Sequence, residues 1–237
     1  MFREWCQLTG CYNNRDFILG AITALMFPAF VTYFAGNERF AIGVVTFLFI
    51  LSAGLVTTPP HKIAKQASSP TKSKNNMAVG IAYVGIALTS IAWLRTQDDH
   101  GLLVIWTFFA VWAMDVGGYF AGKGIGGPKL APKLSPKKTW AGLIGGMILA
   151  AIVSLVISIT FDLGNPFLMP FAGALVAAVA QLGDLYESAV KRSLNAKDSG
   201  NLIPGHGGIL DRVDGLVFAA PIVAFAMAVP FLSKVSG

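Results

Sequence analysis

Residues 166–186 read PFLMPFAGALVAAVAQLGDLY, an apolar run that ends close to an acidic residue, Asp184. A helix that crosses the hydrocarbon core of a bilayer needs about 20 consecutive, mostly apolar residues. A charged side chain in such a segment is costly and normally faces other helices or a watery cavity. This stretch therefore predicts a membrane helix with a polar site at one end.

The rest of the chain repeats this apolar pattern. Hydrophobic residues make up 54% of the 237 residues and charged residues only 13%, whereas a soluble domain is about one quarter charged. The composition predicts an all-α, polytopic integral membrane protein with about seven transmembrane helices. The expected spans are residues 17–35, 40–57, 77–94, 101–120, 139–160, 166–186 and 213–233.

The lysines and arginines predict how these spans are oriented. Most of the 18 basic residues fall in alternate loops, at residues 1–16, 58–76, 121–138 and 187–212. Basic loops stay in the cytoplasm, so we expect a cytoplasmic N-terminus and an outside C-terminus in a bacterial-type inner (plasma) membrane. We read the net charge of +6 as orientation and attraction to anionic lipid, with no nucleic-acid partner.

Two regions follow from this topology. Residues 1–100 form an N-terminal membrane region with three spans and a basic cytoplasmic linker at 58–76. Residues 101–237 form a second membrane region that holds the long polar loops and the acidic residues near span ends. We therefore expect the catalytic and binding residues in this second region, on the cytoplasmic face.

Four aspartates gather at the cytoplasmic ends of the expected spans: Asp115, Asp184, Asp211 and Asp214. Mg²⁺ takes oxygen ligands and usually keeps waters and substrate phosphates in its shell. The group therefore predicts a magnesium site, and a second cation is left open. The alternative is that each acid pairs with a nearby base, for instance Asp211 with Arg192 or Asp184 with Lys191.

Two basic loops suit phosphate groups. Lysines, hydroxyls and free backbone N–H groups at a helix start bind phosphate well. An ordinary cytoplasmic loop would explain the lysines but not the clustered hydroxyls, and a histidine between glycines is equally a simple turn residue. The candidate substrate contacts in these loops are Ser135, Lys137, Lys138, Thr139, Ser188, Lys191, Arg192, Lys197, Asp198, His206 and Arg212.

Residues 188–214 resemble the signature of the phosphatidate cytidylyltransferase (CDP-diacylglycerol synthase) family. The resemblance runs without a gap from Ser188 through Lys191, Asp198 and His206 to Asp214. Upstream elements around Asp115, residues 134–140 and Asp184 are also similar to the family, so the resemblance is sharp over residues 102–233 and faint before them. Many family members are longer than this chain and have more spans.

The resemblance implies an enzyme that transfers CMP from CTP to phosphatidate, giving CDP-diacylglycerol and pyrophosphate. It also implies a homodimer with a cytoplasmic metal centre, in which Asp184 and Asp211 are ligands. We accordingly expect catalytic roles for Asp184, Asp211, Lys191 and Arg212, metal contacts from Asp184, Asp211, Asp214 and Asp115, and substrate contacts from the remaining loop candidates.

The sequence is also compatible with two other functions. A CTP-dependent lipid kinase of the polyprenol or phytol type also needs CTP, metal and a lipid acceptor, but it transfers the γ-phosphate. A cation transporter or channel would also explain acids in a membrane. Transporters usually place their site near the midplane, whereas these acids lie at one edge beside loops suited to phosphate.

Overall fold

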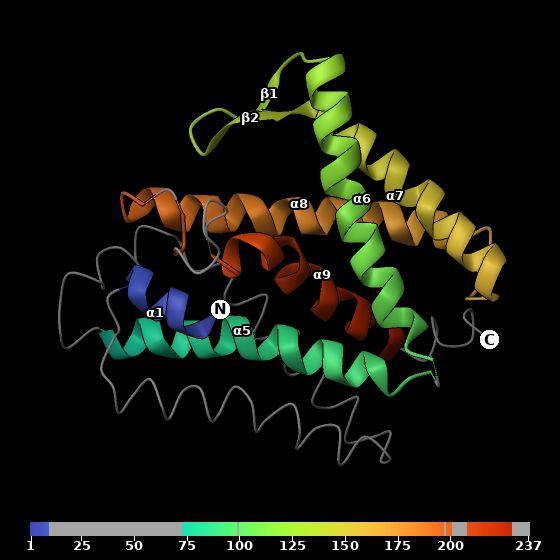
Figure 1. Cartoon of the computed structure of the whole chain (residues 1–237), viewed down its shortest axis with the longest axis horizontal. Coiled ribbons are helices and arrows are strands. Elements are labelled where there is room, and N and C mark those ends of the chain that lie inside the picture. The colour runs from blue at the N-terminus through green and yellow to red at the C-terminus, as the bar shows by residue number, and fades with distance from the viewer. Residues whose placement is uncertain (10–72, 99, 197, 201–207, 229–237) are drawn as a thin grey trace.

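The computed structural model in Figure 1 describes residues 1–9, 73–98, 100–196, 198–200 and 208–228. The expected spans 17–35 and 40–57 lie outside the described residues, as does the linker apart from residues 73–76. The described part of the chain is mostly helical.

The five remaining expected spans coincide with helices as far as the structure describes them, since residues 229–233 of the last span lie outside the described residues. The helices are α1 (Phe2–Thr9), α5 (Ser73–Arg95), α6 (Leu102–Gly124), α7 (Trp140–Phe161), α8 (Met169–Ser193) and α9 (Leu210–Ala228). Of these, α6, α7 and α8 are long and apolar enough to cross a membrane, judged by length and composition alone. The helical, membrane-type fold is therefore confirmed, while the total of seven spans and the orientation of the termini stay predictions.

A short β-hairpin departs from the all-α expectation. Strand β1 (Lys129–Ala131) pairs antiparallel with β2 (Ser135–Thr139), and Lys129 lies opposite Thr139. In Figure 1 this hairpin projects from the top of α6 and α7 over one end of α8. The two strands are short and rich in lysine and proline, so they lack the alternating apolar pattern that predicts a strand from sequence.

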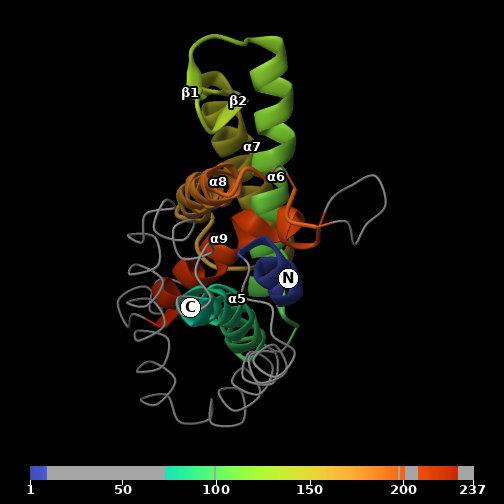
Figure 2. The ribbon, with the colours of Figure 1, turned by 90° about the vertical axis from the view of Figure 1, so that its left-hand side faces the viewer.

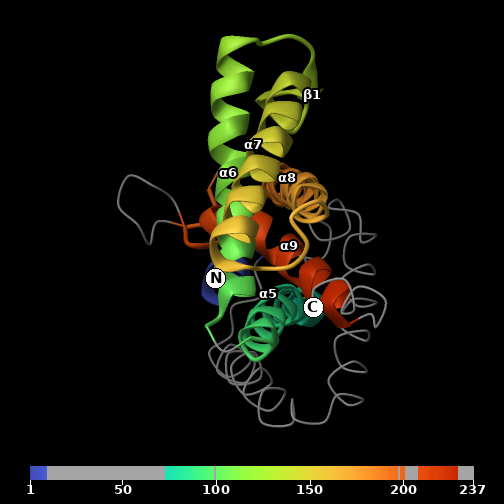
Figure 3. The same ribbon diagram turned by 90° about the vertical axis from the view of Figure 1, so that its right-hand side faces the viewer.

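Helices α6 and α7 form a tightly packed pair, which stands upright in Figures 2 and 3. Two glycines allow this approach: a Cβ atom at Gly142 would lie 2.8 Å from the Gly118 carbonyl oxygen, and one at Gly146 would lie 2.7 Å from the Met114 carbonyl oxygen. Small residues at this spacing are typical of close helix crossings in membranes. The start of α7 is fixed by Thr139, whose side chain accepts a hydrogen bond from the Gly142 N–H (3.1 Å).

The main apolar core lies where α5, α6, α8 and α9 meet, and it includes Trp93, Trp106 and Leu216. Within it, the Trp106 Nε1–H donates a hydrogen bond to the Ser154 Oγ of α7 (2.8 Å), which satisfies a polar group that burial would otherwise penalise. The outer face of α7 instead exposes large apolar side chains such as Ile144, Ile148 and Ile152. An exposed apolar face of this size fits contact with lipid.

We expect Gly146→Ala to lower the stability of the α6–α7 pair by about 1–3 kcal/mol, because the added methyl group overpacks a close helix crossing. The matched control is Gly124→Ala in α6, where a Cβ atom would meet nothing within 4 Å. Unfolding midpoints of the two variants in detergent check the prediction. Equal midpoints would show that the crossing tolerates a side chain.

Candidate functional site

A cavity of about 210 Å³ opens where α6, the hairpin, the start of α7 and the middle of α8 come together. Its polar wall combines two carboxylates, Asp115 and Asp184, with two ammonium groups, Lys137 and Lys138. Complete small-molecule sites have volumes of about 300–1,000 Å³. This cavity is smaller, so in this conformation it fits part of a nucleotide. The lining residues are Met114, Asp115, Gly118, Tyr119, Lys137, Lys138, Thr139, Gly142, Leu143, Gln181 and Asp184.

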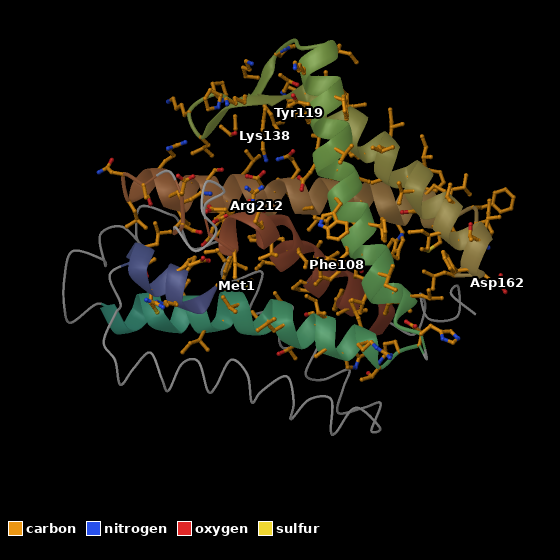
Figure 4. The ribbon with its side chains drawn as sticks, viewed as in Figure 1. Met1, Phe108, Tyr119, Lys138, Asp162 and Arg212 are labelled. Atoms are coloured by element: carbon orange, nitrogen blue, oxygen red, sulfur yellow. The ribbon has the colours of Figure 1, made fainter. Side chains whose placement is uncertain are left out.

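An ion pair between Lys138 and Asp184 crosses this cavity. Lys138 extends from β2 towards α8, and Tyr119 of α6 lies close to the hairpin (Figure 4). Asp184 also accepts a hydrogen bond from the Ser188 hydroxyl one turn further along α8 (3.3 Å). Strand β2 therefore places Lys138 next to Asp184, which lies 46 residues further along the chain.

Asp211, at the start of α9, lies at the centre of a second polar cluster. Its carboxylate accepts hydrogen bonds from Lys191 Nζ (2.6 Å), the Gly208 N–H (2.9 Å) and both the N–H and hydroxyl of Ser199 (2.9 Å each). Burial alone would raise the pKa of the Asp211 carboxyl, but these hydrogen bonds outweigh it and hold that pKa below its usual range. Asp211 is therefore an ionised group that ties two points of the α8–α9 connection, Ser199 and Gly208, to the end of α8.

Asp214 lies next to Asp184 because α8 and α9 cross closely at Gly183. A Cβ atom at Gly183 would lie 2.6 Å from the Asp214 carbonyl oxygen. The Asp214 carboxylate accepts a hydrogen bond from the Gly215 N–H (2.7 Å) and is close enough to Asp184 and Glu187 for their charges to act on it. The crossing thus brings a third predicted aspartate to the same end of the helices.

In this structure, lysines pair with two of the aspartates that were predicted to bind a metal ion. Within the described residues, no group of three or more histidine, cysteine, aspartate or glutamate side chains is arranged to hold an ion. The pairing alternative is realised with partners other than those expected: Lys138 faces Asp184 and Lys191 faces Asp211. Two carboxylates, Asp115 and Asp184, still line one cavity, and Mg²⁺ commonly takes one or two carboxylates and completes its shell with phosphates and water. The residues therefore fit Mg²⁺ when a substrate supplies the remaining oxygens.

The other predicted contacts divide into four groups. Lys137, Lys138 and Thr139 line the cavity, although the Thr139 hydroxyl also serves as the helix cap. Arg212 begins α9 beside α8 (Figure 4) and is close enough to Asp115 for its charge to act there. The structure does not bring the remaining described candidates to the cavity wall; these are Ser135, Ser188, Lys191, Arg192 and Asp198, of which Ser188 and Lys191 instead contact Asp184 and Asp211. Lys197 and His206 lie outside the described residues.

Sequence reasoning missed two buried polar side chains at the site. Gln181 is 9% exposed and lines the cavity, and its Nε2 has no hydrogen-bond partner. Glu187 is 1% exposed and lies 3.6 Å from Lys191 Nζ. The spacing of Gln181 and Asp184 along one helical face was visible in the sequence, but a lone glutamine in an apolar run does not reveal whether its amide is satisfied.

The chain is similar to known cytidylyltransferases. A sequence model of the cytidylyltransferase family matches residues 1–229. A phosphatidate cytidylyltransferase of Brucella suis is 45% identical over 147 residues, which cover 62% of this chain and 54% of that protein. The Bacillus subtilis phosphatidate cytidylyltransferase is 40% identical over 150 residues, 62% of this chain and 55% of that protein. A Rickettsia typhi phosphatidate cytidylyltransferase is 31% identical over 190 residues, 77% of this chain and 83% of that protein.

The chain thus matches about half the length of the Brucella and Bacillus relatives. The family match extends over nearly all of its residues and includes both polar clusters described above. The chain therefore belongs to the cytidylyltransferase family.

Proposed function

We propose that this protein is a phosphatidate cytidylyltransferase, which transfers CMP from CTP to phosphatidate and releases pyrophosphate. The observation that carries the proposal is the cavity in which Lys137 and Lys138 meet Asp115 and Asp184 of the apolar helices α6 and α8. It combines cations for phosphate groups with oxygen ligands for a metal, beside helices that a lipid substrate can reach from the bilayer. The sequence similarity to phosphatidate cytidylyltransferases of Brucella suis and Bacillus subtilis also supports CTP and phosphatidate as the substrates.

The proposed reaction needs no dedicated general base. A phosphomonoester has a second pKa of about 6, so the phosphate of phosphatidate is largely a dianion near neutral pH. One of its oxygens attacks the α-phosphorus of CTP, a P–O bond forms, and the bond from that phosphorus to the bridging oxygen breaks as pyrophosphate leaves. The barrier comes from bringing two anions together, and the charges that lower it must already be in position.

Lys138 and Lys191 are suited to lowering this electrostatic barrier because each can exchange its carboxylate partner for a phosphate. Lys138 would move from Asp184 to the triphosphate, which frees the Asp184 oxygens, and Lys137 would add a second positive charge at the hairpin. Lys191, between Glu187 and Asp211, and Arg212 would contact the lipid phosphate or the leaving group. Ser188 would hold Asp184 in place through its hydrogen bond.

A bound Mg²⁺, held by Asp184 and Asp115 with Asp214 nearby, would neutralise charge on the triphosphate and on the leaving pyrophosphate. In this arrangement Asp211 keeps its hydrogen bonds to the loops, unless it releases Lys191 and joins the metal shell. We propose further that this face is cytoplasmic, that the protein lies in a bacterial inner membrane, and that it works as a homodimer.

We propose that Gln181 contacts the substrate. A buried amide N–H without a partner is costly, and a ligand oxygen or ring nitrogen in the cavity would satisfy it. Gln181 lies one turn before Asp184 on the same face of α8 and, unlike Asp184, carries no charge. It is therefore suited to a neutral acceptor, such as the cytosine ring or an ester carbonyl, rather than to the phosphates themselves.

Labelled CTP tests the proposed reaction. With purified protein, Mg²⁺ and phosphatidate, we expect label from the α-phosphate of CTP to enter the lipid and label from the γ-phosphate to leave as pyrophosphate. The reverse pattern, in which the γ-label enters the lipid, would identify a lipid kinase instead. Thin-layer separation of the labelled lipid distinguishes the two.

Asp184→Asn should lower turnover at least a hundredfold while the protein still inserts into membranes, because the amide can no longer provide a negatively charged oxygen ligand. Asp162→Asn is the matched control, since Asp162 is exposed at the far end of α7 (Figure 4). Rates measured over a series of Mg²⁺ concentrations check the assignment. Near-normal synthesis by the Asp184 variant would remove Asp184 from the metal site.

Gln181→Met should raise the KM for one of the two substrates roughly tenfold, because a lost hydrogen bond of about 1.4 kcal/mol corresponds to that factor. Leu182→Met controls for the new side chain at an exposed neighbouring position. The substrate whose KM changes is the one that Gln181 contacts. If neither KM changes, the amide has no role in binding.

A further inference from the structure

The first helix of the chain reaches the beginning of the last described helix. Glu4 of α1 is 4% exposed, and its carboxylate accepts two backbone hydrogen bonds from residues more than 200 positions away. Oε1 accepts from the Ile209 N–H and Oε2 from the Leu210 N–H, both at 2.8 Å. The Met1 amino group lies 3.5 Å from the same carboxylate.

Packing against α5 holds α1 in this place. Trp5 is 0% exposed and stacks on Tyr83, with 5.1 Å between the ring centroids. Its indole fills the space above Gly80, where a Cβ atom would lie 2.2 Å from the Trp5 Cδ1. The Thr9 hydroxyl donates to the Trp5 carbonyl oxygen (2.8 Å) and closes the last turn of α1. Glu4 is therefore presented to α9 by a well-anchored helix.

Glu4 and Asp211 share the free N–H groups at the start of α9. The first N–H groups of a helix have no partner within it and carry partial positive charge. Asp211 accepts from Gly208, and Glu4 accepts from the next two residues, Ile209 and Leu210. Three successive backbone N–H groups are thus bound by two carboxylates from opposite ends of the chain.

Gly208 is the point where the two carboxylate contacts meet. A Cβ atom there would lie 2.3 Å from the Ser199 hydroxyl oxygen and 2.8 Å from Glu4 Oε1. Ser199 in turn donates to Asp211. Any movement of the backbone at residues 208–210 is therefore transmitted to the Asp211 carboxylate and to Lys191, which pairs with it.

We propose that Glu4 is a positioning residue, which holds the start of α9 so that Asp211 and Lys191 keep their geometry at the reaction site. The function that this geometry serves rests on the proposed cytidylyltransferase activity. The positioning itself does not, because it is a property of the hydrogen bonds between Glu4 and residues 209 and 210. Glu4 thereby acts on the site, although it lies far from it in the sequence.

Hydrogen–deuterium exchange on the full-length protein in lipid nanodiscs, without metal or substrate, tests the positioning. Glu4→Ala should speed exchange of the amides of Ile209 and Leu210 roughly tenfold, and Glu4→Gln should have a smaller effect because one amide oxygen can still accept. Arg3→Ala, an exposed neighbour on the same helix, should leave exchange unchanged. Peptides from α7 report whether a variant has lost its fold as a whole.

The same variants are then assayed with CTP and phosphatidate over a series of Mg²⁺ concentrations. Glu4→Ala should lower kcat at least tenfold and shift the Mg²⁺ concentration for half-maximal rate, whereas Glu4→Gln should recover part of both. Unchanged exchange at residues 209 and 210, exchange that rises equally in α7, or unchanged kinetics would each overturn the proposal. If the wild-type protein makes no CDP-diacylglycerol, the proposed function fails, and the exchange experiment still decides whether Glu4 positions Asp211.

Discussion

A carboxylate on the buried side of a helix must find a cation or a hydrogen-bond donor, and this requirement organises the site. Asp184 meets Lys138, Asp211 meets Lys191 and Ser199, and Glu4 meets two backbone N–H groups. Each pairing offsets the cost of removing a charge from water. These lysine pairs are only partly buried, as the proposed exchange of a carboxylate partner for a substrate phosphate requires.

The hairpin and the helix crossings bring these charges together. The β1–β2 hairpin carries Lys137 and Lys138 over α8, and the glycine crossing of α6 and α7 places Asp115 on the opposite side of the same cavity. A second crossing at Gly183 sets Asp214 beside Asp184. Glycines at these crossings therefore help to set the distances between the carboxylates, because a larger side chain would push the helices apart.

The observed pairing gives a physical account of how such a site remains intact before substrates bind. Four aspartates gathered without counter-charges would repel one another and destabilise the helix ends. Two of them, Asp184 and Asp211, pair with lysines, which offsets this repulsion. Both polar clusters lie within residues 1–229, which the cytidylyltransferase family model matches.

The sequence by itself determined the membrane-type helical fold, the residues that bear charge at helix ends, and the family, because hydropathy, helical spacing and the 188–214 signature are local properties. It did not determine which base pairs with which acid, since Lys138 and Asp184 are 46 residues apart and meet only through a hairpin that has no apolar period. It also did not reveal that Glu4 contacts Ile209 and Leu210, or that the Gln181 amide is left unsatisfied. Only the tertiary structure decides such contacts, because they depend on how closely separate helices cross and on which backbone groups each crossing leaves without a partner.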